Sequence, residues 1–111
     1  MSDHELLELA AKAAGVGGKV RAIQKPYSHD YEIGVGKYRW NPLTNDGDAL
    51  RLAVKMNLFV DTYDAEVLAG WVVDKDALSM NTLTQAKGGD PYAATRRAIV
   101  RAAALIGKEM K

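Results

Sequence analysis

The feature that most constrains the fold lies near the C-terminus, where Gly89-Asp90-Pro91 precedes a long helical run. Aspartate is a favoured N-cap residue, and proline is favoured at the first helical position because the N–H it lacks would have no partner there. The sequence therefore predicts a helix over residues 91–110. With about 100° of rotation per residue, its faces differ in polarity. One carries Tyr92, Ile99, Ala103, Ile106 and Met110, and the opposite one carries Arg97, Arg101 and Lys108.

Two shorter helices are predicted earlier in the chain. Residues 3–14 are rich in leucine, alanine and glutamate, with Ser2 or Asp3 available as the cap. Residues 41–48 form the densest cluster of turn and capping residues, and residues 49–56 then show helical spacing of apolar side chains. Asn45 or Asp46 is expected to cap this second helix.

Four segments have the composition of β-strands. Residues 19–24 alternate charged and apolar side chains, as a half-buried strand does. Residues 31–40 are aromatic and β-branched, which predicts a second strand, short and irregular, that ends at Trp40. Residues 58–63 and 66–73 are also β-rich and are separated by only two residues. They are expected to form an antiparallel hairpin.

Residues 74–89 show no clean hydrophobic period, which favours a long loop or an irregular sheet edge. The order of predicted elements is helix, strand, strand, helix, strand, strand, helix. This order predicts an α+β fold in a single domain, residues 1–111. We expect a small, mainly antiparallel sheet of three to four strands with three helices packed on it.

Composition excludes several classes of function. The chain has no cysteine and two histidines, His4 and His29, so disulfides, thiolate nucleophiles and sulfur-ligated zinc are excluded. No catalytic residue, metal site or cofactor is predicted. No apolar run approaches the roughly 20 residues that span a bilayer, and the first residues do not resemble a signal peptide. We therefore expect a cytoplasmic protein with no membrane partner.

The most distinctive candidate binding loop contains Trp40, Asn41, Asp46 and Asp48, which place an aromatic ring beside an amide and two carboxylates. Loops that enter helices often build sites. The structural alternative is that Trp40 anchors the core, Pro42 stiffens the turn and the acids cap free amides of the helix. On composition alone, the structural role is the more common one for such residues.

Charge is distributed in blocks, although 15 basic and 14 acidic residues nearly cancel. Residues 44–86 carry seven acids and three bases, whereas residues 87–111 carry six bases and two acids. The basic face formed by Arg97, Arg101 and Lys108 could contact nucleic acid. Alternatively, the blocks neutralise each other within the fold. In that case Arg96 or Arg97 is expected to pair with Asp46 or Asp48 and so to link the second helix to the third, with Arg96 and Asp48 as one such pair.

Two segments together resemble a known family. They are WNPLTNDGDALRLAVK, residues 40–55, and DPYAATRRAIVRAA, residues 90–103. These motifs resemble short proteins of tailed bacteriophages and prophages of Gram-negative bacteria, the phage α-β-α sandwich domain, and are distantly similar to NinX-like phage proteins. The resemblance implies a sheet layered between helices and a role in the cytoplasm of an infected or lysogenic bacterium. It implies no reaction and no catalytic residues.

These observations favour a small phage or prophage accessory protein that acts by binding a host or phage protein, without catalysis. The aromatic, turn-rich strands over residues 31–40 and 58–73 offer edges for pairing, which would also permit a homodimer. The alternative is a nucleic-acid-binding or regulatory protein that uses the basic C-terminal helix. A third hypothesis is a small-ligand or enzymatic pocket at the Trp-Asn-Pro loop.

Overall fold

The computed structural model describes residues 1–16, 19–22, 31–35, 38–77 and 79–110. Each helix begins at a side-chain cap, as the sequence predicts. Ser2, Asn45 and Asp90 accept backbone N–H groups of the first turns of the three helices. The elements, in chain order, are α1 (Asp3–Ala14), β1 (Lys19–Ala22), β2 (Tyr31–Val35), β3 (Tyr38–Trp40), α2 (Asp46–Lys55), β4 (Phe59–Thr62), β5 (Glu66–Asp74), β6 (Ser79–Ala86) and α3 (Pro91–Glu109).

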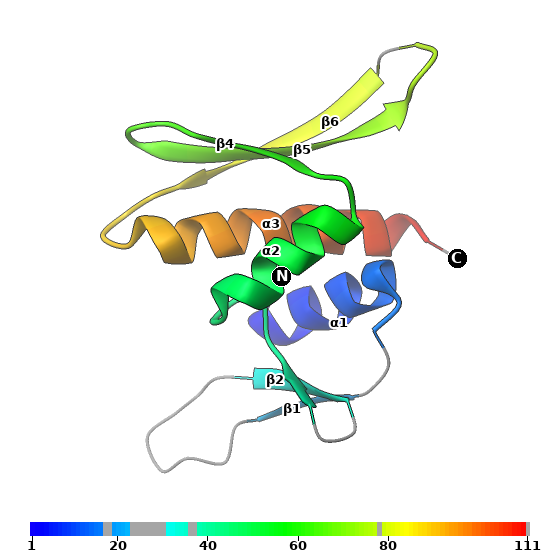
Figure 1. Ribbon diagram of the computed structural model, residues 1–111, viewed down its shortest axis with the longest axis vertical. Coiled ribbons are helices and arrows are strands. Elements are labelled where there is room, and N and C mark those ends of the chain that lie inside the picture. Colours follow the sequence, from blue (N-terminus) through cyan, green and yellow to red (C-terminus); the bar gives the residue numbers. More distant parts are fainter. Residues whose placement is uncertain (17–18, 23–30, 36–37, 78, 111) are drawn as a thin grey trace.

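The helices form a layer between two sheets (Figure 1). Each sheet has three antiparallel strands, in the orders β1-β2-β3 and β4-β5-β6. Three helices with small antiparallel sheets confirm the predicted α+β class. The order of layers differs from the sheet between helices that the family resemblance implies, because the two sheets lie outside and the helices lie between them.

One buried face of α3 packs on helices and the other packs on a sheet. Ile99 and Val100 belong to a cluster with buried residues of α1 and α2. Ala98 and Ala102 belong to a second cluster, with Val67 of β5 and its neighbours. Residues four apart lie above one another on a helix, so these two alanines form a shallow stripe on which the sheet rests. Because alanine side chains are small, the sheet packs close to the backbone of α3 at these positions.

The apolar face predicted for the last helix is only partly buried. Ile99 and Ala103 lie in the core, but Tyr92 and Met110 are exposed. These two residues lie at the ends of α3, where fewer elements reach the helix. Periodicity identified one of the two buried faces and overestimated its buried length; it missed the face formed by Ala94, Ala98 and Ala102.

Helices α1 and α3 approach each other closely at Gly107. This glycine is buried, and a Cβ built on it would collide with the backbone carbonyl of Leu9. Only glycine leaves room for this contact. The position therefore determines how closely the C-terminal half of α3 packs on α1.

Two strand predictions require correction. Residues 31–40, predicted as one irregular strand, form two antiparallel strands in which Val35 pairs with Tyr38. Residues 74–89, for which a long loop was one expectation, contain the eight-residue strand β6 at the edge of its sheet. Of the β6 side chains, Leu83 alone is buried, so the strand lacks the hydrophobic alternation that would reveal it.

Candidate functional site

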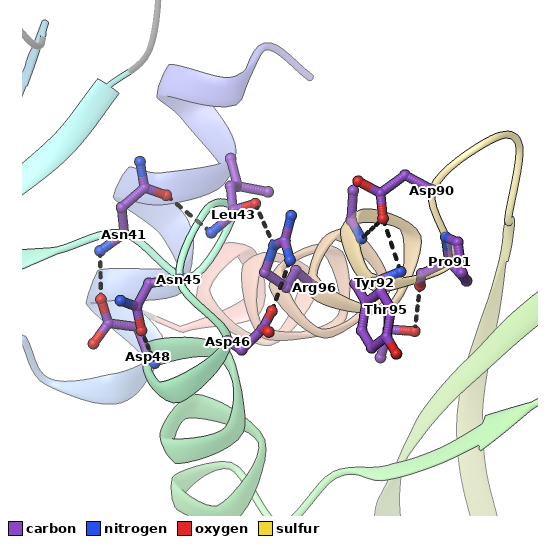
Figure 2. A network of polar contacts seen from close by, with 11 residues as sticks. Asn41, Leu43, Asn45, Asp46, Asp48, Asp90, Pro91, Tyr92, Thr95 and Arg96 are labelled. Carbon is purple, nitrogen blue, oxygen red and sulfur yellow. Dashed lines mark hydrogen bonds and ion pairs between the residues drawn. The ribbon is translucent and has the colours of Figure 1, made fainter.

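The predicted binding loop folds back onto the first turn of α2 (Figure 2). Asn41 is only 6% exposed. Its backbone N–H donates to Asp48 Oδ2 at 3.0 Å, and its side-chain Oδ1 accepts from the backbone N–H of Leu43 at 2.9 Å. Its carbonyl oxygen accepts from the backbone N–H of Asn45 at 2.9 Å. Asn41, which the sequence made a candidate ligand-binding residue, therefore stabilises the turn.

Asp48 is similarly engaged by its own chain. Its side chain is 12% exposed, and Oδ1 accepts from Arg51 Nη2 at 2.7 Å while Oδ2 accepts from Asn41. The partial positive charge at a helix N-terminus also stabilises a carboxylate in the first turn. Both oxygens have partners within the fold, which supports a structural role for Asp48.

Arg96 of α3 reaches this loop and joins it to the last helix (Figure 2). Its Nε donates to the carbonyl oxygen of Leu43 at 2.8 Å, and its Nη1 donates to Asp46 Oδ1 at 2.7 Å. Of the two expected partners, Asp46 and Asp48, Asp46 makes the ion pair, because the Asp48 carboxylate is turned toward Asn41 and Arg51. Asp46, two residues earlier, is 72% exposed and lies within reach of α3.

The apolar members of the loop are packed rather than presented to a ligand. Pro42 is fully buried. Trp40 is half-buried and packs, together with Leu43, against buried residues of the helices. The loop is thus a joint between the helices, and its polar groups stabilise that joint.

The predicted basic face is divided among several neighbours. Arg97 Nη2 donates to Asp3 Oδ1 of α1 at 2.9 Å. Arg101 Nη1 donates to the carbonyl oxygen of Thr84 and to Oε1 of Gln85, both at 2.9 Å. Lys108 is exposed. Two of the three cations therefore contact other elements of the same chain.

Arg97 and Arg101 do lie together at one hollow of about 340 Å³, which Lys108 does not line. The hollow lies where α1, α3 and β6 meet, and none of the predicted loop residues lines it. Its two arginines are held by the contacts with Asp3 and with β6. Its lining consists of Met1, Leu6, Gln85, Arg97, Arg101 and Leu105.

A projecting hairpin, residues 71–77 and 79–82, was not predicted from the sequence; we call it the arm. It consists of the end of β5 and the start of β6, and it extends away from α3 at one end of the molecule (Figure 1). Val72, Val73 and Met80 are 49%, 57% and 56% exposed. The β-rich composition of residues 66–73 was visible in the sequence, but the exposure of their second half was not.

An open groove of about 980 Å³ lies between the arm and the end of α3. Its apolar part comes from Trp71 and Val73 of the arm and from Leu105 and Ile106 of α3. Both polar and apolar residues line the rest. The remaining lining residues are Met56, Asn57, Val72, Lys75, Asn81, Thr82 and Glu109.

Within the described part of the chain, no three or more of the residues His, Asp and Glu gather where they could hold a metal ion. The helices of that part are also too short or too polar to cross a membrane. In comparisons with known proteins, no family model, curated protein or solved structure matches the chain.

Proposed function

We propose that this protein acts by binding another protein chain through the arm, without a reaction of its own. The observation that carries the proposal is the exposure of Val72, Val73 and Met80. Val72 and Met80 are directly opposite each other in the β5–β6 register, so their side chains share one face of the sheet. Contiguous exposed apolar surface marks interaction sites, whereas isolated exposed apolar residues are ordinary.

The groove beside the arm supports the same proposal. Trp71 is half-buried there, with Leu105 and Ile106 across from it. Large aromatic and aliphatic side chains in a concave site provide the packed anchors on which protein interfaces depend. A partner segment lying along the arm would contact both the groove and the exposed valines.

For the biological setting, we propose an accessory protein of a tailed phage or prophage, acting in the host cytoplasm on a host or phage protein. This proposal rests on the two sequence motifs over residues 40–55 and 90–103.

Nucleic-acid binding through the last helix has less support. Arg96, Arg97 and Arg101 each donate to groups of this chain, so a phosphate would compete with these partners for their N–H groups. Lys108 remains as an exposed cation. A ligand pocket at the Trp-Asn-Pro loop also has less support, since Asn41 and Asp48 hold the loop closed.

Site-specific photo-crosslinking tests the proposed function. A photoreactive amino acid is placed at Val73 or Met80, and the chain is produced at its natural level in the cells that carry its gene. The matched control is Asp64, an exposed position in the turn between β4 and β5, at the opposite end of β5 from the arm. We expect discrete protein adducts from the two arm positions and none from Asp64.

Three outcomes would contradict the proposal. The first is the absence of adducts at both arm positions, and the second is adducts with nucleic acid alone. The third involves Leu50 and Val54, which are four residues apart on α2 and are also exposed. Adducts from Leu50 without adducts from the arm would place the binding surface on α2.

A further inference from the structure

We infer that the partner bound at the arm is a second copy of this chain, paired through the free edge of β6. The inference rests on the proposed function, because it names the partner of the same surface. Strand β6 is the outer strand of its sheet, and its sequence, SMNTLTQA, contains no charged residue and no proline. Charged residues and prolines on edge strands usually prevent a sheet from pairing with another chain.

The backbone groups that β6 leaves free follow from the register. The N–H of Lys87 donates to the carbonyl oxygen of Ala65, so Ala65 and Lys87 form a hydrogen-bonded pair. Such pairs alternate along antiparallel strands. By this alternation, the backbone groups of Asn81 and Leu83 form hydrogen bonds with β5. The backbone groups of residues 80, 82 and 84 point away from β5.

One part of this edge is already occupied. Arg101 of α3 donates to the carbonyl oxygen of Thr84 at 2.9 Å. This contact agrees with the register, because it requires the Thr84 carbonyl to point away from β5. The edge is therefore covered at Thr84 and open at Met80 and Thr82, both of which are exposed and belong to the arm.

The charges on the edge strands favour a second copy. In an antiparallel pair of identical strands, any charged residue near the centre faces its own kind, and like charges directly opposite are destabilising. Among the four described edge strands, β1, β3 and β4 carry Lys19 and Arg21, Arg39, and Asp61, respectively. Strand β6 alone can pair with itself without such repulsion.

The free groups also define a register. An antiparallel pair related by a two-fold axis at Asn81 places Met80 of one copy opposite Thr82 of the other. Both residues point their backbone groups outward, so the two equivalent pairs supply four N–H···O bonds. Asn81 then faces Asn81 of the second copy, and the carbonyl oxygen of Thr84 keeps its bond to Arg101.

This arrangement joins the two sheets into one of six strands. It places Met80 beside Thr82 of the second copy on the exposed face of the sheet, and it brings the two exposed Val72–Met80 pairs together across the axis. The arm extends away from α3 (Figure 1). In the inferred pairing, the helices of the two copies therefore lie toward opposite ends of the joined sheet. The edge and the apolar side chains of the arm are thus used in the same contact.

Disulfide trapping tests the register, because the natural chain has no cysteine. In the inferred pairing, the two Asn81 Cα atoms are about 4.5 Å apart, the spacing of a non-hydrogen-bonded pair and within the range that a disulfide spans. Asn81→Cys should therefore form a covalent dimer under mild oxidation. Thr84→Cys is the matched control on the same strand, since its Cα atoms would be about 20 Å apart.

Sedimentation of the uncrosslinked chain tests the edge itself. The natural chain should sediment at twice 12.1 kDa at high concentration. Thr82→Lys, which places charges near the axis, should reduce the mass to that of a single chain, whereas Thr62→Lys on the edge of β4 should leave it doubled. Circular dichroism of each variant establishes that it is folded, and Thr82→Pro, which removes an outward N–H and none of the bonds to β5, provides a second disruption of the edge.

Failure of this inference is distinguishable from failure of the proposed function. A single-chain mass at every concentration overturns the second copy, while protein adducts at Val73 would still support a different partner. A dimer that survives both Thr82 variants, or one trapped equally by Thr84→Cys, also overturns the β6 pairing. Absence of protein adducts at the arm overturns the proposed function itself.

Discussion

Arg96 Nη1 donates to Asp46 Oδ1 at 2.7 Å and links the first turn of α2 to α3 across fifty residues of sequence. The same guanidinium donates through Nε to the carbonyl oxygen of Leu43. One side chain of the basic C-terminal block thus contacts the acidic middle block within the fold. At this loop, opposite charges of the two blocks are paired within the fold.

The bond from Arg96 to Leu43 should contribute more to stability than the ion pair with Asp46. Arg96 is 17% exposed, whereas Asp46 is 72% exposed and its ion pair is screened by water. We expect Arg96→Ala to lower the free energy of unfolding by about 2 kcal/mol and Asp46→Ala to lower it by less than about 1 kcal/mol. Urea unfolding measures both, and equal losses would contradict this assignment.

Asp48 should be more important than its partner Arg51. Replacing Asp48 with alanine leaves the buried N–H of Asn41 without this acceptor, at a cost of about 1–3 kcal/mol. The Arg51 side chain is 72% exposed, so Arg51→Ala should cost less than about 1 kcal/mol. Thermal and urea unfolding of the two variants provide the comparison. A larger loss from Arg51→Ala would exclude the buried N–H as the main cause.

Gly107→Ala should destabilise the protein although alanine is the better helix former. The added methyl group would meet the carbonyl of Leu9, so α1 and α3 must separate, at a cost of about 1–3 kcal/mol. Gly89→Ala is the control because nothing lies near its Cβ position, and its effect should be no more than about 1 kcal/mol. A neutral Gly107→Ala would show that the helices separate without cost.

The internal contacts of the arginines predict weak binding to nucleic acid. We expect no electrophoretic shift of duplex DNA or single-stranded RNA at moderate salt. At low salt, any residual shift should fall on replacing the exposed Lys108 with alanine. A salt-resistant shift abolished by Arg97→Ala and Arg101→Ala would instead support the basic helix as an interface.

Local features of the fold could be predicted from the sequence because they depend on neighbouring residues. The caps Asn45 and Asp90 are examples, since each bonds within its own first turn. The link from Arg96 to Asp46 or Asp48 was also predicted, and the structure shows that Asp46 is the partner. That choice depends on how the loop turns Asp48 toward Asn41, a contact seven residues apart that no periodicity records.

Features set by distant contacts could not be predicted. Strand β6 has one buried side chain, Leu83, so pairing with β5 defines it, and hydrophobic alternation does not. The two-sided burial of α3 depends on which elements reach its alanine stripe. The exposed edge at Met80 and Thr82 depends both on the pairing of β6 with β5 and on the packing against α3. For this reason, the arm could not be predicted from the sequence.

Residue-resolved amide hydrogen exchange measures the central claim most directly, because the inferred contact is made by the backbone of the arm. At high protein concentration, the N–H groups of Met80 and Thr82 should exchange as slowly as those of Asn81 and Leu83, which bond to β5. On dilution, only Met80 and Thr82 should become fast. Fast exchange of Met80 and Thr82 at every concentration would contradict the pairing of β6 with a second copy.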